Sequence, residues 1–524
     1  MEITYTRPAL PQTVVQSLIE ALGADAVLTQ SEEVDTYRDP YWLPGDDTYI
    51  ASAVVEPTST EQVQAVMRIA NSARVPVWPV SQGRNNGYGG PSPRVAGSIQ
   101  VSLRKMNKVL EINEDLAYAV VEPGVRWIDL HAALEAGNHN LAVSVPDIGW
   151  GSVIGNALDN GITYMPNGTD FATLTGFEIV LADGEILRTG MGAQPGNKAW
   201  HVYKRSLGPA LDALFTQSNF GIVVRAGVML QRKPEAFRTM ILALDKDSDL
   251  EAGMVTLREL MLDGTLRGVP CMYPAPRNGA MLDDAEVPQP RPWTEEEIEQ
   301  YGRETGLGRW GVRVGLWEDA EIMEYKTRKI AERWTQIPGA RIVRAGRVYT
   351  PEEYGEITLT AEKNFAGIPS MFLVEKTPPG IGHIGFSPVV ANDPDELRKV
   401  IDAVRHHLGE AGILHSGGIY FTSARSCVVV TGIQFDTRNE EAVRNAFNVT
   451  KRLIVEVGKL GYGEYRAHLD IMELASDQYS FNDHIYRRFA EKIKDAVDPN
   501  GIIAPGRHGV WPGGQRPVER NGVA

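Results

Sequence analysis

The ten residues SerGlnGlyArgAsnAsnGlyTyrGlyGly, Ser81–Gly90, decide how this sequence is interpreted. They contain four glycines and follow the apolar run Val75–Val80, which has the composition of a strand. Glycine tolerates positive φ, so such a loop can turn its N–H groups inward and bind a pyrophosphate without a lysine. A structural Gly-rich turn is the alternative, and the loop alone does not separate the two interpretations.

A second glycine-rich segment favours the cofactor interpretation. ProAspIleGlyTrpGlySerValIleGlyAsnAla, Pro146–Ala157, offers small residues where a ligand backbone can approach closely, and then begins a helix. It is not the nicotinamide fingerprint, because no GlyXGlyXXGly run opens a helix within a βαβ unit. No Walker sequence occurs either. The two segments therefore predict a cofactor site of another type.

Length and composition narrow the class of protein. The chain has 524 residues, which is too long for one hydrophobic core and predicts two large units. Its formal charge of −15 argues against nucleic acid as a partner, because phosphate binding needs clustered Lys and Arg. The two cysteines, Cys271 and Cys427, exclude a disulfide framework, an iron–sulfur cluster and a multi-Cys zinc site.

The placement of the histidines and the hydropathy of the chain predict neither a metal site nor a membrane segment. His406 and His407 lie on a polar helix pattern and His383 in an expected turn, without metal-ligand spacing, so no metal is predicted. The N-terminal segment lacks the pattern of a signal peptide, and no run of eighteen apolar residues occurs. We therefore expect a cytoplasmic protein without a membrane partner.

Strand and helix patterns alternate from Ile50 to about Gln231, and a charged, helix-rich stretch follows Pro234. Such mixed patterns predict an α+β or α/β fold. In the first part we expect strands at 52–57, 75–80, 118–123 and 222–230, helices near 14–22 and at 60–73 and 127–137, and a hairpin at 177–188. In the second part we expect helices at 295–305, 321–336, 394–409 and 439–459 and strands at 311–316, 384–390 and 428–435.

Several motifs follow one another in a specific order along the chain. They are ValValGluPro (Val54–Pro57), GlyArgAsnAsnGlyTyrGlyGly (Gly83–Gly90), ValGluProGlyVal (Val121–Val125), ProAspIleGlyTrpGlySerValIleGlyAsn (Pro146–Asn156), PheThrGlnSerAsnPheGlyIleVal (Phe215–Val223), GlyTyrGlyGluTyrArg (Gly461–Arg466) and AspProAsnGlyIleIleAlaProGly (Asp498–Gly506). In this order they resemble the vanillyl-alcohol oxidase and p-cresol methylhydroxylase family, which includes eugenol oxidase. The resemblance runs from about residue 35 to residue 512 and is weakest between about 240 and 380.

The resemblance implies an α+β fold with two domains and a bound FAD. It assigns residues 1–238 to the first part of an FAD-binding domain, 239–462 to a substrate-binding cap, and 463–524 to a segment that returns to the FAD-binding domain. The cap would contain an antiparallel sheet with flanking helices. The implied reaction is oxidation of para-substituted phenols by benzylic hydride transfer to the flavin, through a quinone methide.

The resemblance assigns the phenol to Tyr88, Tyr465 and Arg466. An arginine and two tyrosine hydroxyls can all donate hydrogen bonds to an oxyanion, so they favour a phenolate over a phenol of pKa near ~10. Charge placed in this way stabilises the transition state of hydride loss. The structural alternative is that Tyr88 packs the loop and that Tyr465 and Arg466 belong to a domain interface.

By the same resemblance, Asp147 would act as a base or activate water beside the benzylic carbon, although Pro-Asp also commonly caps a turn. Trp150 is expected to support the FAD. The expected cofactor-binding residues are Ser81, Gly83, Arg84, Asn85, Asn86, Gly87, Gly89, Pro146, Gly149, Ser152, Gly155, Asn156, Gly221, Ile222 and Arg507.

Departures from the family concern the flavin link and the pocket. Many members attach FAD through a His in a MetHisHis run or through a Tyr, but Val428 and Val429 align with the histidines and Glu375 lies near the tyrosine position. We therefore predict non-covalent FAD, with a shifted alignment or attachment through Tyr420 or His415 as the alternatives.

Three positions are expected at the substrate pocket: Asn167, Arg313 and Val429. Asn167 replaces an aromatic residue of the relatives. Arg313 lies on the strand face opposite Val312 and Val314. There it could bind a polar tail of the substrate, but we expect it to face solvent.

The sequence leaves two alternative functions open: an FAD-dependent 2-hydroxy-acid dehydrogenase, and a non-catalytic protein that binds flavin or an aromatic ligand. The expected partners are a small phenol and either O₂ or another electron acceptor, and no CysXXCysHis haem motif occurs. The resemblance also suggests a homodimer or a larger homo-oligomer.

Overall fold

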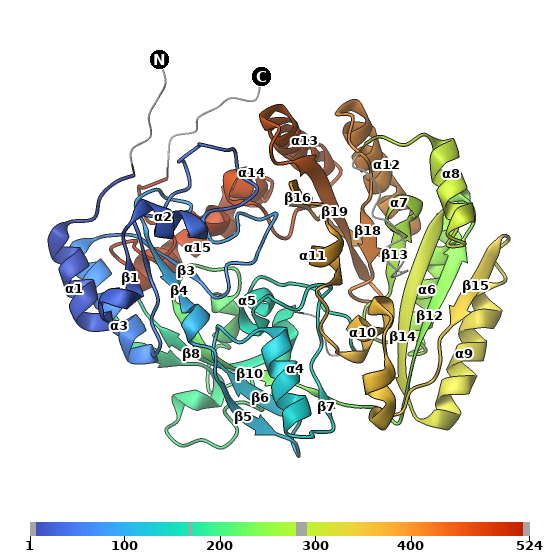
Figure 1. The fold of residues 1–524 in the computed structure, drawn as a ribbon, viewed down its shortest axis with the longest axis horizontal. Coiled ribbons are helices and arrows are strands. Elements are labelled where there is room, and N and C mark those ends of the chain that lie inside the picture. The colour runs from blue at the N-terminus through green and yellow to red at the C-terminus, as the bar shows by residue number, and fades with distance from the viewer. Residues whose placement is uncertain (1–6, 167–169, 279–290, 517–524) are drawn as a thin grey trace.

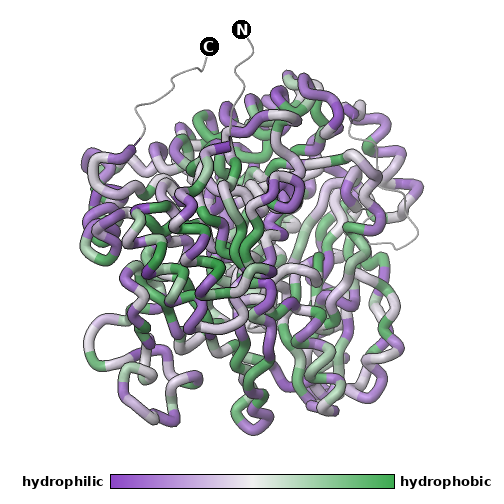
Figure 2. The backbone as a smooth tube through the Cα atoms, turned by 60° about the vertical axis from the view of Figure 1, so that its left-hand side comes forward, coloured by the Kyte–Doolittle hydropathy of each residue, from purple (hydrophilic) through white to green (hydrophobic). Residues whose placement is uncertain are grey.

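The fold is described from a computed structural model that covers residues 7–166, 170–278 and 291–516. It has two halves, each with its own β-sheets. The chain starts in the first half, passes through the second, and its C-terminal segment returns to the first half (Figure 1). Hydrophobic segments run through the interior and hydrophilic ones lie at the periphery (Figure 2). This arrangement confirms the predicted α+β fold with two domains.

The first half begins with a small mixed sheet in the order β1-β2-β4-β3. Helix α3 (Thr60–Ala73) begins where the Ser59 hydroxyl accepts a hydrogen bond from the Gln62 N–H, and it ends at Arg74, whose φ is 53°. Its apolar face is buried against the sheet. The strands are β1 (Val27–Leu28), β2 (Ala53–Val55), β3 (Val77–Val80) and β4 (Ile99–Ser102), with α1 (Gln12–Leu22) beside α3.

A second, antiparallel sheet follows in the order β5-β6-β10-β8-β9. It shares a separate hydrophobic core with helices α4 (Trp127–Ala136) and α5 (Val153–Leu158). The strands are β5 (Val109–Asn113), β6 (Tyr118–Val121), β8 (Leu174–Val180), β9 (Ile186–Arg188) and β10 (Ile222–Met229). Of the two glycine-rich segments, one is therefore the loop after β3 of the first sheet, and the other leads into α5, which packs in the core of the second sheet.

The second half contains an eight-stranded antiparallel sheet in the order β15-β12-β14-β13-β18-β19-β16, with β17 paired to β19. One face packs on long helices, and the other carries a smaller aromatic core together with the short helix α10. The strands are β12 (Ala236–Leu244), β13 (Cys271–Pro274), β14 (Trp310–Glu318), β15 (Ala340–Ala345), β16 (Ile381–Phe386), β17 (Val389–Ala391), β18 (Gly418–Tyr420) and β19 (Ser426–Asp436). The helices of this half are α6 (Leu250–Leu262), α7 (Ala275–Asn278), α8 (Glu295–Glu304), α9 (Ala320–Trp334), α10 (Thr360–Ala366), α11 (Phe372–Lys376), α12 (Pro394–Glu410) and α13 (Glu440–Lys459).

The C-terminal segment returns to the first half through α14 (Met472–Asp477) and α15 (Phe481–Val497). The fully buried Lys494 ammonium donates to the Asp498 carboxylate at 2.6 Å and to the carbonyls of Asn219 at 2.7 Å and Ile503 at 2.6 Å. Ile503 in turn forms a bridge with Val77 of β3. Because all three donors of Lys494 are satisfied, this buried ion pair fixes the end of the chain beside the first sheet.

Two local predictions were wrong. The expected strand at 384–390 is two strands, β16 and β17, and Pro388 between them has no N–H for a ladder bond. His383 lies within β16 and not in a turn. No helix in the described part of the chain combines the length and apolarity needed to cross a bilayer.

Candidate functional site

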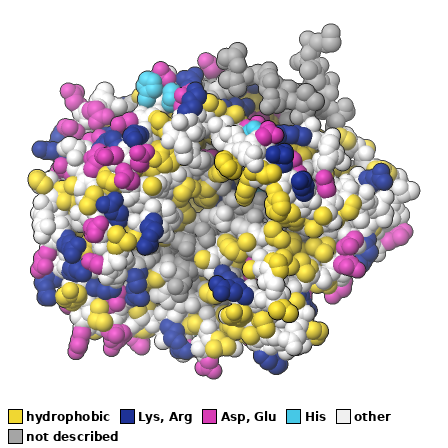
Figure 3. Space-filling model, turned by 180° about the vertical axis from the view of Figure 1, so that it is seen from behind, with side chains coloured by type: hydrophobic (Ala, Val, Ile, Leu, Met, Phe, Trp, Pro, Cys, Tyr) yellow, Lys and Arg dark blue, Asp and Glu magenta, His cyan; other side chains and the backbone are white. Residues whose placement is uncertain are grey.

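A cavity of about 750 Å³ lies where the two halves and the C-terminal segment meet. Seen from behind, hydrophobic side chains gather around a central hollow, whereas charges of both signs are spread elsewhere (Figure 3). This volume is within the range of about 300–1,000 Å³ that is usual for ligand and cofactor sites. Its wall comes from the loop after β3, the segment leading into α5, the cap strands and the residues after α13.

The loop Ser81–Gly90 reaches the cavity because its glycines permit close packing. Gly87 has φ +84°, and a Cβ there would lie 2.7 Å from the His383 ring. Gly89 has φ +102°, and a Cβ there would lie 2.2 Å from Leu469 Cγ. Neither glycine lines the cavity itself, so both bring the loop against the cap and the C-terminal segment.

Most of the expected cofactor-binding residues do line the cavity. Gly149 is a third exception, because a Cβ there would meet Pro369 at 2.6 Å, which makes it a packing position as well. The cavity wall includes Ser81, Gly83, Arg84, Asn85, Asn86, Pro146, Ser152, Gly155, Asn156, Gly221, Ile222 and Arg507. Gly155 allows α5 to approach the loop, since its Cβ would lie 2.1 Å from Ser81 Oγ.

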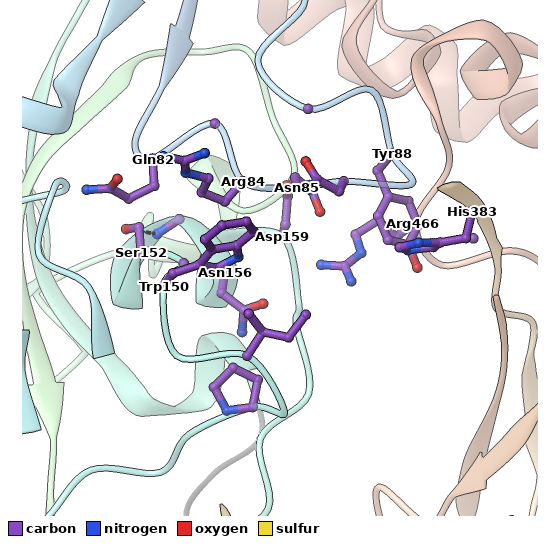
Figure 4. Close-up of a pocket in the computed structure, with 18 of the residues that line it drawn as sticks. Gln82, Arg84, Asn85, Tyr88, Trp150, Ser152, Asn156, Asp159, His383 and Arg466 are labelled. Carbon is purple, nitrogen blue, oxygen red and sulfur yellow. Dashed lines mark hydrogen bonds between the residues drawn. The ribbon is translucent and has the colours of Figure 1, made fainter. Parts of the chain in front are cut away.

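One end of the cavity is positively charged. The Arg84 guanidinium stacks on the Trp150 ring at 4.8 Å, and burial together with Arg104 and Arg126 lowers its pKa. Mutual repulsion of this kind is relieved when an anion binds, so this end suits a pyrophosphate. In Figure 4, Arg84, Gln82 and Ser152 lie at this end, opposite Tyr88 and His383.

Asp159 organises the middle of the wall, and sequence reasoning missed it. Its carboxylate accepts from Arg507 at 2.5 Å and from the Asn85 amide at 3.3 Å. Burial raises the pKa of Asp159, but Arg507 and His508 outweigh burial, and the net shift is strongly downward. The carboxylate therefore stays ionised and holds Arg507 at the cavity.

Tyr88, Tyr465 and Arg466 converge at the other end of the cavity, and we call these three side chains the clamp. The Arg466 guanidinium carbon lies 4.2 Å from the centre of the Tyr88 ring and 5.5 Å from that of Tyr465. Arg466 Nε is buried without a hydrogen-bond partner among the described residues. Arg466 lies beside Tyr88 in Figure 4. A buried charged donor without a partner is costly, so the clamp suits a ligand that offers an acceptor.

Burial sets the protonation of the groups around the clamp. It raises the pKa of Tyr465, against the opposing effect of Arg466, so this hydroxyl stays protonated and can donate. It also raises the pKa of Glu464 to about 8, while Glu464 accepts from the Ser387 N–H at 2.6 Å. Ser387 Oγ lies 3.4 Å from the Tyr88 hydroxyl, so Glu464 and Ser387 support the clamp from behind.

Asp147 lines the cavity and takes hydrogen bonds from two side chains of the second half. The Asn364 amide donates to its carboxylate at 2.8 Å, and Arg313 Nη2 lies 3.4 Å from the same oxygen. Arg313 also donates to the Tyr273 hydroxyl at 3.2 Å, and Tyr273 donates to Tyr420 at 3.2 Å. Hydrogen bonds through Arg313 and Tyr273 thus connect the Asp147 carboxylate to Tyr420 of the second half.

The expectation that Arg313 faces solvent was wrong. Arg313 is only 4% exposed, and its guanidinium lies over the rings of Tyr164 at 4.8 Å and Phe365 at 4.9 Å. The strand alternation was interpreted correctly, but β14 is central in its sheet and both of its faces are covered. The residue does not line the cavity itself.

The expectation for Val429 was also wrong. Its side chain lies in the main hydrophobic core, on the opposite face of β19 from the cavity, and the neighbouring Val430 lines the cavity instead. Val428 pairs with Tyr420 on the cavity face but is not part of the wall either. Asn167 lies outside the described residues.

Sequence reasoning missed several residues of the wall on the cap side: Arg277, His383, Thr431 and Gln434. Burial lowers the pKa of His383 to about 4, and nearby Arg277 adds to this, so its imidazole is neutral near pH 7. No single-sequence signal marks these residues, because they reach the cavity only through the pairing of β13, β18, β19 and β16.

The residues of the wall fit FAD on several counts. The Arg84 end offers positive charge to a pyrophosphate, and glycines let the backbone of the wall approach a ligand. Arg466 Nε and Thr431 Oγ1 are buried wall atoms that lack a hydrogen-bond partner in the described part of the chain. A ligand with several acceptors along its length would satisfy both.

Comparison with known proteins agrees with this fit. Residues 51–190 match the model of an FAD binding domain. The flavoprotein subunit of 4-cresol dehydrogenase from Pseudomonas putida is 30% identical over 507 residues, which cover 95% of each chain. The 1'-carboxy-chondrochloren decarboxylase of Chondromyces crocatus is 29% identical over 94% of this chain and 97% of the relative.

A solved structure extends the likeness to the whole fold. The 4-ethylphenol oxidase from Gulosibacter chungangensis, in complex with isoeugenol, superposes with a TM-score of 0.90 at 34% identity. The match covers 96% of this chain and 98% of that one, so both halves and the returning C-terminal segment are shared. The chain therefore belongs to the vanillyl-alcohol oxidase and p-cresol methylhydroxylase family of FAD-dependent oxidoreductases.

Proposed function

We propose that this oxidoreductase acts on para-substituted phenols at the benzylic carbon, with 4-alkylphenols, 4-hydroxybenzyl alcohols and methoxylated analogues as substrates. The observation that carries the proposal is the convergence of Tyr88, Tyr465 and Arg466 at one end of the cavity. The names of two relatives, a 4-cresol dehydrogenase and a 4-ethylphenol oxidase, support the same substrate class.

The clamp would bind the substrate as its phenolate. Arg466 supplies a full positive charge, and the hydroxyls of Tyr88 and Tyr465 supply neutral donors, so all three favour an oxyanion. Electron density from a phenolate oxygen weakens the C–H bond at the para-benzylic carbon, and loss of hydride leaves a quinone methide. When bound, FAD supplies the acceptor for that hydride.

Asp147 would act on the oxidised substrate. A carboxylate held by Asn364 and Arg313 can take a proton from water that adds to the quinone methide, which gives an alcohol. It can equally take a proton from the carbon next to the benzylic position, which gives a vinyl product. With a benzyl alcohol as substrate it can take the proton of the side-chain hydroxyl, which gives the aldehyde, so the same residue serves hydroxylation, alcohol oxidation and desaturation.

The attachment of FAD depends on which nucleophiles reach the cavity. Non-covalent attachment was predicted from Val428 and Val429, but neither residue lines the cavity. Of the two alternatives named from the sequence, Tyr420 lines the cavity and His415 does not, whereas His383 also lines it with a neutral imidazole. Non-covalent FAD stays a prediction, and acid precipitation of the wild type and of His383→Ala and Tyr420→Phe tests it.

Flavin colour in the supernatant of all three proteins would support untethered FAD. Colour that stays in the wild-type pellet but moves to the supernatant in one variant would identify the residue that carries the link. Colour retained in all three pellets would also contradict non-covalent attachment and would exclude both residues.

The proposal also covers the electron acceptor and the oligomeric state of the protein. We propose O₂ or a separate redox partner as acceptor, because one relative is named as an oxidase and another as the flavoprotein subunit of a dehydrogenase. We also propose a homodimer or larger homo-oligomer. Stopped-flow reoxidation in air and light scattering test these two points.

Anaerobic mixing tests the substrate class. Bleaching of the flavin by 4-ethylphenol or vanillyl alcohol supports the proposal, because both carry a phenol and a benzylic hydrogen. Bleaching by a 2-hydroxy acid alone would favour a 2-hydroxy-acid dehydrogenase. No bleaching by any of them would favour a protein that binds flavin without catalysis.

The name of the decarboxylase relative supports a second recognition element in the cavity. That relative acts on a carboxylated compound by its name. A carboxylate on the substrate of the present protein would need a cation at the side-chain end of the cavity.

A further inference from the structure

Arg277 is a cation on the cavity wall that the phenol chemistry does not use. It follows β13 in the short helix α7, on the cap side of the cavity. Its guanidinium lies 5.5 Å from the centre of the Tyr273 ring. Among the described residues it takes part in no hydrogen bond or ion pair.

The other charges on this side of the cavity are matched. Asp147 and Arg313 lie 3.4 Å apart and balance each other. The pKa of Tyr420 is raised to about 12, chiefly by burial, so this side chain is neutral. The pKa of His383 is lowered to about 4, so it is neutral as well. Arg277 therefore leaves one positive charge uncompensated in the described part of this wall.

Arg277 is half-buried, so its uncompensated charge carries a desolvation cost that a bound anion removes. The guanidinium presents paired N–H groups that match the two oxygens of a carboxylate. Aromatic rings line the space beside it, among them Tyr164 and Tyr420, which stack at 6.2 Å between ring centres. These surroundings suit an aromatic acid better than a free inorganic anion.

We propose that Arg277 binds a carboxylate on the side chain of the substrate, so that the protein acts on 4-hydroxyphenyl acids and not only on neutral alkylphenols. This inference rests on the proposed function, because it assumes that the clamp holds the phenol of the same molecule. The clamp and Arg277 then bind the two ends of one ligand, and Asp147, which pairs with the buried Arg313, lines the same cavity.

The test compares matched acids and amides that cannot be oxidised. We choose 4-hydroxybenzoate with 4-hydroxybenzamide, and trans-4-hydroxycinnamate with its amide, because none has an sp³ benzylic C–H. Dissociation constants come from the change in the flavin spectrum of the holoenzyme at equilibrium. In the wild type, at least one acid should bind about tenfold more tightly than its amide, which corresponds to about 1.4 kcal/mol.

Variants assign that preference to a residue. Arg277→Met should bring the ratio of acid to amide affinity to about one while the amide binds within about twofold of the wild type, as expected for loss of a single charge–carboxylate contact. Arg277→Lys keeps the charge and should keep part of the preference. Arg303→Met on α8, where the side chain is 63% exposed, is the control and should change neither ligand.

The outcomes separate the two proposals. If amides bind as well as acids to the wild type while 4-ethylphenol still bleaches the flavin, the role of Arg277 is refuted and the phenol chemistry stands. If Arg277→Met weakens acids and amides equally, Arg277 supports the flavin or the fold, and the inference is also refuted. If no phenol binds or bleaches the flavin, both proposals fail together.

Discussion

Replacing Arg466 by Gln should raise the pKa of a phenol bound in the cavity. Free phenols ionise near pH ~10, so holding one as phenolate at pH 7.5 requires a shift of about 2.5 pKa units, or about 3.4 kcal/mol. A hydrogen bond from a charged donor contributes about 1.5–3 kcal/mol and a neutral one about 0.5–1.5 kcal/mol. Arg466 therefore supplies about half of the stabilisation, and Tyr88 and Tyr465 supply the rest.

From these magnitudes, Arg466→Gln should raise the pKa of the bound phenol by about 1–2 units, and Tyr465→Phe by about 0.5–1 unit. The assay is a pH titration of the near-ultraviolet difference absorption of bound phenol itself, which has no benzylic hydrogen. Both variants should also slow anaerobic flavin reduction by 4-ethylphenol at least about tenfold, or about 1.4 kcal/mol.

The control for this pair is Arg438→Gln, because Arg438 is 72% exposed and pairs only with Asp436 in the described structure. It should leave the pKa of the bound phenol unchanged. The same pKa in wild type, Arg466→Gln and Tyr465→Phe would refute the clamp. Since Tyr465→Phe removes a single oxygen, a defect in folding would not explain its effect.

Three other substitutions test the site and its supports. Asp147→Asn should leave phenol binding within about threefold and slow product formation by about 10²-fold or more; unchanged turnover would contradict its role as a base. Gly89→Ala, at φ +102° and 2.2 Å from Leu469 Cγ, should cost about 1–3 kcal/mol in urea unfolding, whereas Gly409→Ala in helix α12, which meets nothing within 4 Å, should stabilise the fold by about 0.4–1 kcal/mol. Folded Glu464 keeps its proton up to about pH 8, while the unfolded chain releases it near 4.5, so the folded state binds more protons in this window and stability falls as pH rises. Glu464→Gln should flatten that loss in unfolding measured between pH 5 and 8, and an unchanged slope would mean that another group carries it.

The sequence pattern predicted those helices and strands that bury only one face. Helix α3 has a Ser59 cap and a single apolar face, so its period and its start are both visible in the sequence. Strand β12 was missed because nearly all of its residues are buried. Its run therefore shows no alternation, and a continuous apolar run does not distinguish a strand from a helix.

The candidate site was predictable where one segment carries it. Tyr465 and Arg466 lie in one short motif and Tyr88 in another, and both motifs reach the cavity. The cap side depends on strand register, which the sequence does not reveal. Val429 was chosen where Val430 lines the cavity, and a difference of one residue places a side chain on the other face of a strand.

A cation such as Arg277 would also suit a 2-hydroxy acid, so by itself it favours neither substrate class. The clamp distinguishes a phenolic substrate from a 2-hydroxy acid. An aliphatic acid held by Arg277 offers no oxyanion to Arg466, whose buried Nε would then stay without a partner, at about 1–3 kcal/mol or more. A 4-hydroxyphenyl acid satisfies Arg277 and Arg466 at once. The two arginines therefore favour a substrate with two acidic groups on opposite sides of one ring, which neither a neutral alkylphenol nor an aliphatic hydroxy acid provides.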